Sequence, residues 1–181
     1  MKFSYETPRL ELKVLPASMA ENVLEFMERN KDIFDRYEAK RCEDFFTEEF
    51  QSKLLTCELQ LFLKSQGARF YVFEKNNSDR IIGCVHFYNM RQAPYDSCLV
   101  GYKFDKDFQH RGYATEALAA ALDIVFRDAK IHRVEATVMP SNTASIKLLE
   151  KLGFQCEGLL RKNICIDGRW EDHYLYALLN E

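Results

Sequence analysis

Residues 109–115 form a basic turn with one glycine between two predicted elements of regular structure. The alternating run 98–104 before the turn indicates a strand, and the apolar residues from 114 to 125 after it recur at helical spacing. The first turn of a helix has backbone N–H groups without internal partners, and these bind anions together with the helix dipole. Gly112 lacks a Cβ, which lets a ligand approach the backbone closely. The turn therefore predicts a phosphate site at Gln109, His110, Arg111, Gly112, Tyr113, Ala114 and Thr115.

The spacing Gln-x-x-Gly-x-Ala of this turn differs from the Walker pattern and from the three-glycine dinucleotide pattern. It resembles the acetyl-CoA pyrophosphate loop of the GNAT acetyltransferase superfamily. A second stretch, from Ile131 through Pro140-Ser141-Asn142 to Leu152-Gly153-Phe154, resembles the ribosomal-protein N-acetyltransferase (RimJ/RimL-like) branch, as does the opening run 7–12. The resemblance covers nearly the whole chain, residues 1–181, as a single N-acetyltransferase domain.

The resemblance implies an α/β (α+β) fold with a mixed central sheet of about seven strands and helices on both faces. Acetyl-CoA, as cosubstrate, would lie where strands 98–104 and 132–139 splay apart. Backbone N–H groups of Tyr102, Lys103 and Phe104 would then bind its pantetheine arm and thioester carbonyl, and Asn142 would contact the arm. Ser145 lies one helical turn after Asn142, and we expect its hydroxyl to protonate the leaving thiolate.

Two positions depart from the family pattern. The strand position at which many relatives carry Glu is Leu99, and the position of their general-acid Tyr is Leu149. The family's usual acid and base therefore do not transfer to this chain. The base remains open among four residues, of which we assign Glu135 to the catalytic set beside Ser145; the four are Glu135, His86, His173 and Asp172.

Three functions remain open on these residues. The first is direct acetyl transfer to a primary amine, such as a protein N-terminus, because an α-amine is about a tenth neutral at pH 7 and a lysine below about a thousandth. The second is acetylation of a polyamine, amino acid or aminoglycoside, which an acid-lined pocket near Glu38, Asp96 and Asp172 would support. The third is a CoA-binding module without catalysis. Cys84 and Cys98 have no recognisable His partner for a nucleophilic mechanism.

The composition is that of an ordinary globular protein. The 181 residues are 47% hydrophobic and 29% charged with a net charge of −3, so no basic face for nucleic acid is indicated. No membrane span, signal peptide or metal-ligand spacing is apparent. The six cysteines form no Cys-x-x-Cys pair, and free thiols in a reducing compartment are expected. We expect a cytoplasmic monomer or homodimer.

The remaining elements follow from periodicity and capping signals. Strands are predicted at 9–15, 69–75, 80–90, 98–104, 132–139 and 154–162, and on either side of the Asp167-Gly168 hairpin turn. Helices are predicted from a capping box at Ser18 and Glu21 to about residue 30, and from Thr47 to about 65. Two further helices are expected to run from the phosphate turn to about 129 and from Asn142 to Gly153.

Overall fold

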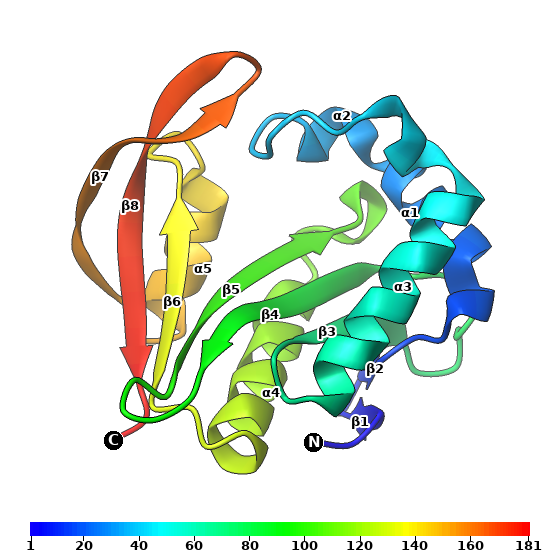
Figure 1. Ribbon diagram of the computed structural model, residues 1–181, viewed down its shortest axis with the longest axis horizontal. Coiled ribbons are helices and arrows are strands. Elements are labelled where there is room, and N and C mark those ends of the chain that lie inside the picture. The colour runs from blue at the N-terminus through cyan, green and yellow to red at the C-terminus, as the bar shows by residue number, and fades with distance from the viewer.

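A mixed sheet of eight strands, in the order β1-β2-β3-β4-β5-β6-β8-β7, forms the centre of the molecule (Figure 1). The computed structural model describes residues 1–181. Neighbouring strands are antiparallel except β5 and β6, which are parallel. The strands are β1 Ser4–Glu6, β2 Leu10–Lys13, β3 Ala68–Glu74, β4 Gly83–Arg91, β5 Ser97–Phe104, β6 Arg133–Val138, β7 Gln155–Ile166 and β8 Arg169–Leu179.

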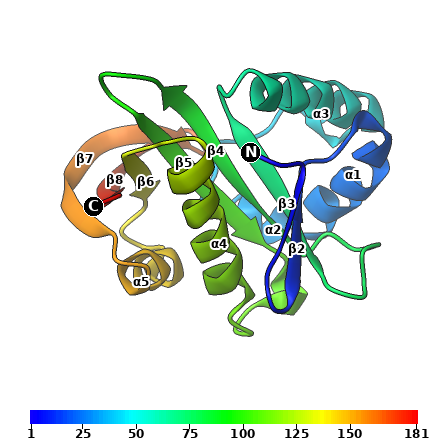
Figure 2. The same ribbon diagram turned by 90° about the horizontal axis from the view of Figure 1, so that it is seen from below.

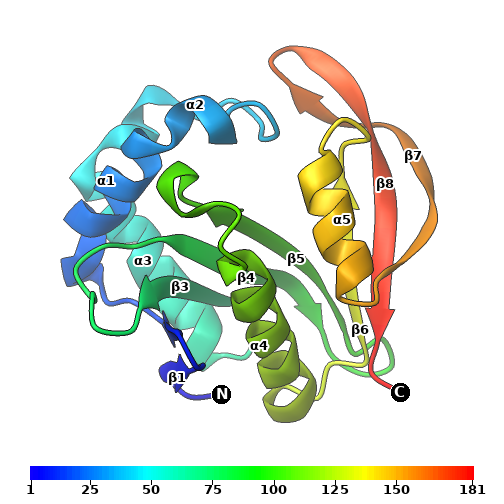
Figure 3. The same ribbon diagram turned by 180° about the vertical axis from the view of Figure 1, so that it is seen from behind.

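Helices cover both faces of this sheet, as the family resemblance implies. Helices α1 and α3 lie on one face and α4 and α5 on the other, which Figures 2 and 3 show from below and from behind. Each face buries an apolar cluster, the larger one containing Leu118 and Val125 of α4 and the smaller one Phe26 of α1. The helices are α1 Ala20–Arg29, α2 Lys31–Phe34, α3 Glu48–Leu63, α4 Tyr113–Asp128 and α5 Thr143–Lys151.

Helix starts were predicted correctly where a side chain caps them. Thr47 Oγ1 accepts the Phe50 N–H ahead of α3, and Asn142 Oδ1 accepts the Ser145 N–H ahead of α5. The capping box predicted at Ser18 is wrong. Short 3-10 helical backbone occupies Ala17–Met19, and α1 begins at Ala20 with no side-chain cap.

The sheet has one strand more than the seven expected, because the short β1 pairs with β2 at its edge. Strand β4 begins at Gly83, later than the predicted residue 80. A Cβ at Gly83 would lie 2.4 Å from Phe104 Cδ1, so glycine is required for the Phe104 ring to pack across it. This contact holds Phe104, the last residue of β5, in place beside the first cavity of the site described below.

Strands β5 and β6 pair over only three positions and then diverge. Their register ends at Leu99 opposite Glu135, beyond which β6 pairs with β8 alone (Figure 1). The Asp105 N–H still donates to the Ile82 carbonyl at 2.9 Å on the β4 side. Since the direction of strand N–H groups alternates, Lys103 also faces β4, whereas the N–H groups of Tyr102 and Phe104 face the gap.

Candidate functional site

Two cavities meet in the gap between β5 and β6. The first, of about 550 Å³, lies between the phosphate turn, α2 and α5. The second, of about 490 Å³, is lined by strands β3 to β8 and by residues from the segment 37–41. Six residues border both cavities, which therefore adjoin, and we call the pair the passage; the six are Tyr37, Glu38, Tyr102, Lys103, Asn142 and Ser145.

The phosphate turn forms one mouth of this passage. Gly112 is left-handed, with φ of 78°, and starts α4 without any side-chain cap. The first backbone bond of the helix runs from the Glu116 N–H to the Gly112 carbonyl, which leaves the N–H groups of the preceding turn for a ligand. Six of the seven residues predicted for this turn line the cavity: Gln109, His110, Gly112, Tyr113, Ala114 and Thr115. Arg111 is not among them, and its guanidinium stacks on the Phe108 ring at 4.9 Å.

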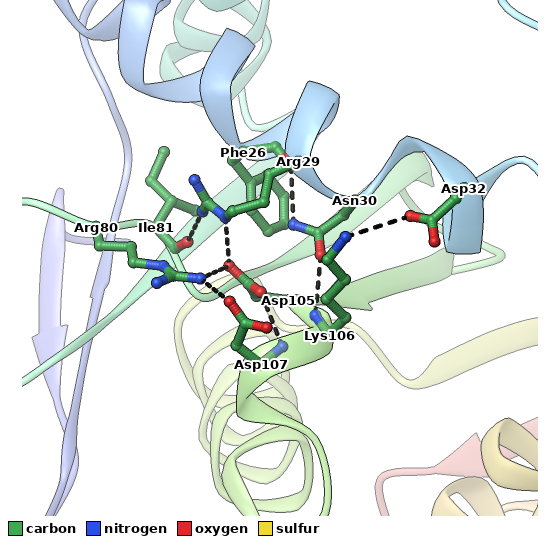
Figure 4. Close-up of polar contacts among 9 residues, drawn as sticks. All are labelled: Phe26, Arg29, Asn30, Asp32, Arg80, Ile81, Asp105, Lys106 and Asp107. Carbon is green, nitrogen blue, oxygen red and sulfur yellow. Dashed lines mark hydrogen bonds and ion pairs between the residues drawn. The ribbon is translucent and has the colours of Figure 1, made fainter.

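The buried carboxylate of Asp105 links helices α1 and α2 to the segment that leads into the phosphate turn (Figure 4). Asp105 is fully buried, and its Oδ2 accepts hydrogen bonds from Arg29 Nε at 2.9 Å and Arg80 Nη2 at 3.0 Å. Burial alone would raise the pKa of Asp105, but the Asp107 N–H and the two arginines outweigh it and lower the pKa. Asn30 Oδ1 also accepts the Lys106 N–H at 2.9 Å. Helices α1 and α2 are thus joined to the segment before the phosphate turn by ionic and neutral hydrogen bonds.

Two hydroxyl groups lie where the cavities meet. Tyr102 Oη and Ser145 Oγ are 2.7 Å apart, one from β5 and the other from the first turn of α5. Burial raises the pKa of Tyr102 to about 12, so the phenol stays protonated. Asn142 Oδ1 is occupied by the helix cap, whereas its amide N–H groups have no partner and border the passage. Tyr102 and Ser145 thus form a pair that can pass a proton within the passage.

The second cavity carries more positive than negative charge. Lys103 Nζ lies 2.5 Å from Glu38 Oε1, and Lys103 and Arg41 lower the pKa of Glu38 although burial opposes this. Arg41 and Arg69 also line the cavity, so its charged side chains are three cations and one carboxylate. Asp96 and Asp172, predicted beside Glu38 in an acid-lined pocket, do not line it. Asp172 Oδ1 instead accepts the Lys162 N–H.

The four base candidates are distributed unequally. His86 and His173 both line the second cavity, whereas Glu135 lines neither cavity and pairs with Arg133 Nε at 2.7 Å. Leu149, at the position of the relatives' general-acid Tyr, is fully buried in the core. The structure therefore brings Ser145 to the passage and leaves Glu135 outside it.

The buried thiols are not set up as nucleophiles. Cys84 borders the second cavity and burial raises its pKa, while burial, helped by Glu135, raises the pKa of Cys98 to about 12. The thiolate is the nucleophilic form, and both thiols stay protonated at neutral pH.

One network beside the second cavity was not predicted. Arg69 on β3 contacts Glu58 Oε1 of α3 at 2.7 Å and His86 Nδ1 of β4 at 2.8 Å. Tyr71 Oη donates to the other Glu58 oxygen at 3.2 Å. The strand register sets Arg69 opposite His86, and this pairing has no local sequence signal.

Comparisons with known proteins agree with the geometry. The family described as acetyltransferase (GNAT) domain matches residues 9–155, and the chain belongs to this family. Probable N-acetyltransferase YjcK of Bacillus subtilis (strain 168) is 36% identical over 169 residues, which are 93% of each chain. [Ribosomal protein uS5]-alanine N-acetyltransferase of Escherichia coli (strain K12) is 39% identical over 115 residues, which are 62% of this chain and 59% of that protein.

Two solved structures extend the likeness to nearly the full chain. The ribosomal-protein-S5-alanine acetyltransferase from Vibrio fischeri has a TM-score of 0.94 at 31% identity and covers 99% of this chain and 98% of its own. Mycobacterium smegmatis RimJ in complex with CoA-disulfide has a TM-score of 0.87 at 25% identity, over 94% and 81% of the two chains. The protein is an N-acetyltransferase, and acetyl-CoA is its cosubstrate. None of its helices has the length and apolar character needed to span a bilayer.

Proposed function

We propose that the protein acetylates the N-terminal α-amino group of a protein, with ribosomal protein uS5 as the first acceptor to test. The observation that carries this proposal is the pair of adjoining cavities, one at the phosphate turn and a second that is left for an acceptor. The relatives that act on the alanine of this ribosomal protein support the choice of acceptor.

Acetyl-CoA is assigned to the first cavity. Its phosphates would accept the free N–H groups at the start of α4, beside the basic turn. Its pantetheine arm would lie along the open edge of β5, accepting from the N–H groups of Tyr102 and Phe104, with the Asn142 amide nearby. The Lys103 N–H faces β4 and is not available to the arm, so Lys103 contributes only its side chain to the passage. Arg111 lies outside the lining of the first cavity, and its contact with a phosphate stays a prediction.

The reaction needs a neutral amine and a protonated leaving group. When bound, acetyl-CoA supplies the acetyl group as an activated thioester. The acceptor nitrogen forms a bond to the acetyl carbon, the carbon–sulfur bond breaks, and Ser145 gives its proton to the sulfur. Tyr102 restores the Ser145 proton through the 2.7 Å contact and recovers its own from solvent. N–H donors at the open β5 edge stabilise the negative charge that develops on the thioester oxygen.

The charge of the second cavity favours this acceptor over a polyamine or aminoglycoside. The one carboxylate that lines it, Glu38, is already paired with Lys103, and Arg69 is paired with Glu58 behind the lining, so no free carboxylate faces the cavity. A polycation would find no carboxylate to offset its several charges, whereas a peptide N-terminus brings a single amine and several carbonyl oxygens. We place the enzyme in the cytoplasm, where ribosomal proteins are made. Because one chain lines the whole passage, the reaction does not need a second subunit.

The test is an acetylation assay followed by mass spectrometry. Peptides with the uS5 N-terminus, the same peptides blocked at the N-terminus but carrying an internal lysine, and spermidine are each incubated with acetyl-CoA. We expect acetylation of the free N-terminus alone. Preferred acetylation of spermidine or of the blocked peptide would overturn the proposed acceptor.

A further inference from the structure

The general base is the missing component of the site, and two histidines of the second cavity are placed to supply it. His86 comes from β4 and His173 from β8, on opposite sides of the gap between β5 and β6. His173 is 3% exposed, and both rings line the cavity that Tyr102 and Ser145 also border. Which nitrogen of each ring carries the proton decides which ring can accept one.

The His173 ring is held in one tautomer by its own strand. His173 Nδ1 lies 3.1 Å from the Glu171 carbonyl oxygen, and a carbonyl oxygen can only accept. The proton of the neutral ring is therefore on Nδ1, and Nε2 carries the lone pair. No protein group donates to Nε2. The ring thus offers a free proton acceptor to the cavity.

The His86 ring is held in the opposite tautomer. Its Nδ1 is 2.8 Å from Arg69 Nη2, and a guanidinium can only donate, so the proton of the ring is on Nε2. Burial, followed by the charges of Arg69 and Lys103, lowers the pKa of His86 to about 3. His86 is therefore a fixed donor that does not take a proton at neutral pH.

The other two candidates are occupied outside the cavity. Glu135 pairs with Arg133, and Asp172 Oδ1 accepts the Lys162 backbone N–H. The charged groups that face the second cavity are Glu38, Arg41, Arg69 and Lys103, and Glu38 is already paired with Lys103. His173 Nε2 is thus the unoccupied proton acceptor of this cavity.

We propose that His173 is the general base, with Nε2 accepting the proton that the acceptor amine loses as the carbon–nitrogen bond forms. The proposal rests on the proposed function. The imidazolium formed on His173 returns its proton to water, while Ser145 protonates the leaving sulfur, so protons balance over one turnover. His86 faces the same acceptor with an N–H group, which matches a carbonyl oxygen of a peptide.

The test compares His173→Ala with the matched variant His86→Gln, which keeps a donor where Nε2 stands. A general base contributes about 100-fold or more, so we expect kcat of His173→Ala to fall by that factor while the acetyl-CoA Kd stays unchanged. Added imidazole should restore turnover of His173→Ala in proportion to its unprotonated form. His86→Gln removes no proton acceptor from the cavity, so imidazole should restore none of the activity that this variant loses.

A measurement on the wild-type enzyme tests the tautomers without any variant. Nitrogen-15 chemical shifts should place the proton on Nδ1 of His173 and on Nε2 of His86. A His173 proton on Nε2, turnover of His173→Ala within a few-fold of wild type, or absence of imidazole rescue in a variant that still binds acetyl-CoA would overturn the proposal. If the wild-type enzyme acetylates another amine but no peptide, only the proposed acceptor is wrong. The His173 test is then run with that amine.

Discussion

The hydroxyl oxygens of Tyr102 and Ser145 are 2.7 Å apart, at the point where the two cavities of the passage meet. Tyr102 comes from the open end of β5 and Ser145 from the N-terminal turn of α5, the helix that follows β6, so the contact bridges the gap between the diverging strands. This pair is the structure's closest equivalent of the general-acid Tyr that Leu149 replaces.

Removing either hydroxyl should slow the chemical step without weakening cosubstrate binding. We expect Ser145→Ala to lower kcat by about 100-fold and Tyr102→Phe to lower it less, because Ser145 holds the proton that is transferred. Single-turnover kinetics measures the step, and calorimetry measures the acetyl-CoA affinity. If the double variant loses the product of the two single effects, the hydroxyls act independently and the relay is wrong.

Replacing Gly112 by Trp should abolish binding of acetyl-CoA. The side chain would fill the mouth of the first cavity, where a Cβ already lies 3.4 Å from Arg9 Nη2. Gly168→Trp is the matched control, since Gly168 has φ of 76° against 78° for Gly112, at a hairpin with nothing within 4 Å. Left-handed strain is thus similar in both variants, at about 1–2 kcal/mol. Equal calorimetric affinities in the two variants would contradict the assignment of the phosphate turn.

Asp105→Asn should destabilise the protein in a pH-dependent way. The lowered pKa of Asp105 means that its contribution is present above the unfolded-state pKa, near 3.9, and is lost as pH falls through the folded-state value. At pH 7 we expect a loss of about 2 kcal/mol in the free energy of unfolding, below the value for a fully buried pair because both arginines are partly exposed.

Urea unfolding of the wild type and of Asp105→Asn, at pH 7 and near pH 3, measures the difference between their free energies of unfolding. This difference should be smaller at the lower pH. Asp107→Asn is the control, since Asp107 also pairs with Arg80 but is 54% exposed, and it should cost well under 1 kcal/mol. A gap between Asp105→Asn and wild type that widens in acid would contradict a lowered pKa of Asp105 in the folded protein.

Cys84→Ala and Cys98→Ala should each remain active. Burial keeps both thiols protonated, so direct transfer predicts kcat/KM within about threefold of wild type for either variant. Mass spectrometry of the enzyme with acetyl-CoA alone should find no acetylated cysteine. An acetyl adduct on Cys84 that transfers to the amine would establish a two-step mechanism.

Much of this site could be predicted because its signals are local. Thr47, Asn142 and Gly112 each act within one turn of a helix. Periodicity located the strands β5 and β6, and the family resemblance implied that they diverge. The capping box at Ser18 failed because the same residue types also suit 3-10 helical backbone.

The interactions that could not be predicted join residues distant in sequence. Arg29 and Arg80 reach Asp105 from positions 76 and 25 residues away. The opposite tautomers of His86 and His173 depend on Arg69 and Glu171, and the first of these contacts follows only from strand register. The sequence therefore left four base candidates and favoured Glu135, which the folded chain places outside the passage.

The two mouths of the passage also bear on traffic through the enzyme. With the proposed peptide acceptor, free CoA would leave from the first cavity and the acetylated chain from the second, so neither product would have to wait for the other. Such an acceptor would keep its body outside and insert only its first residues. For the proposed acceptor, size would therefore be no barrier, and selection would fall on how its N-terminus begins.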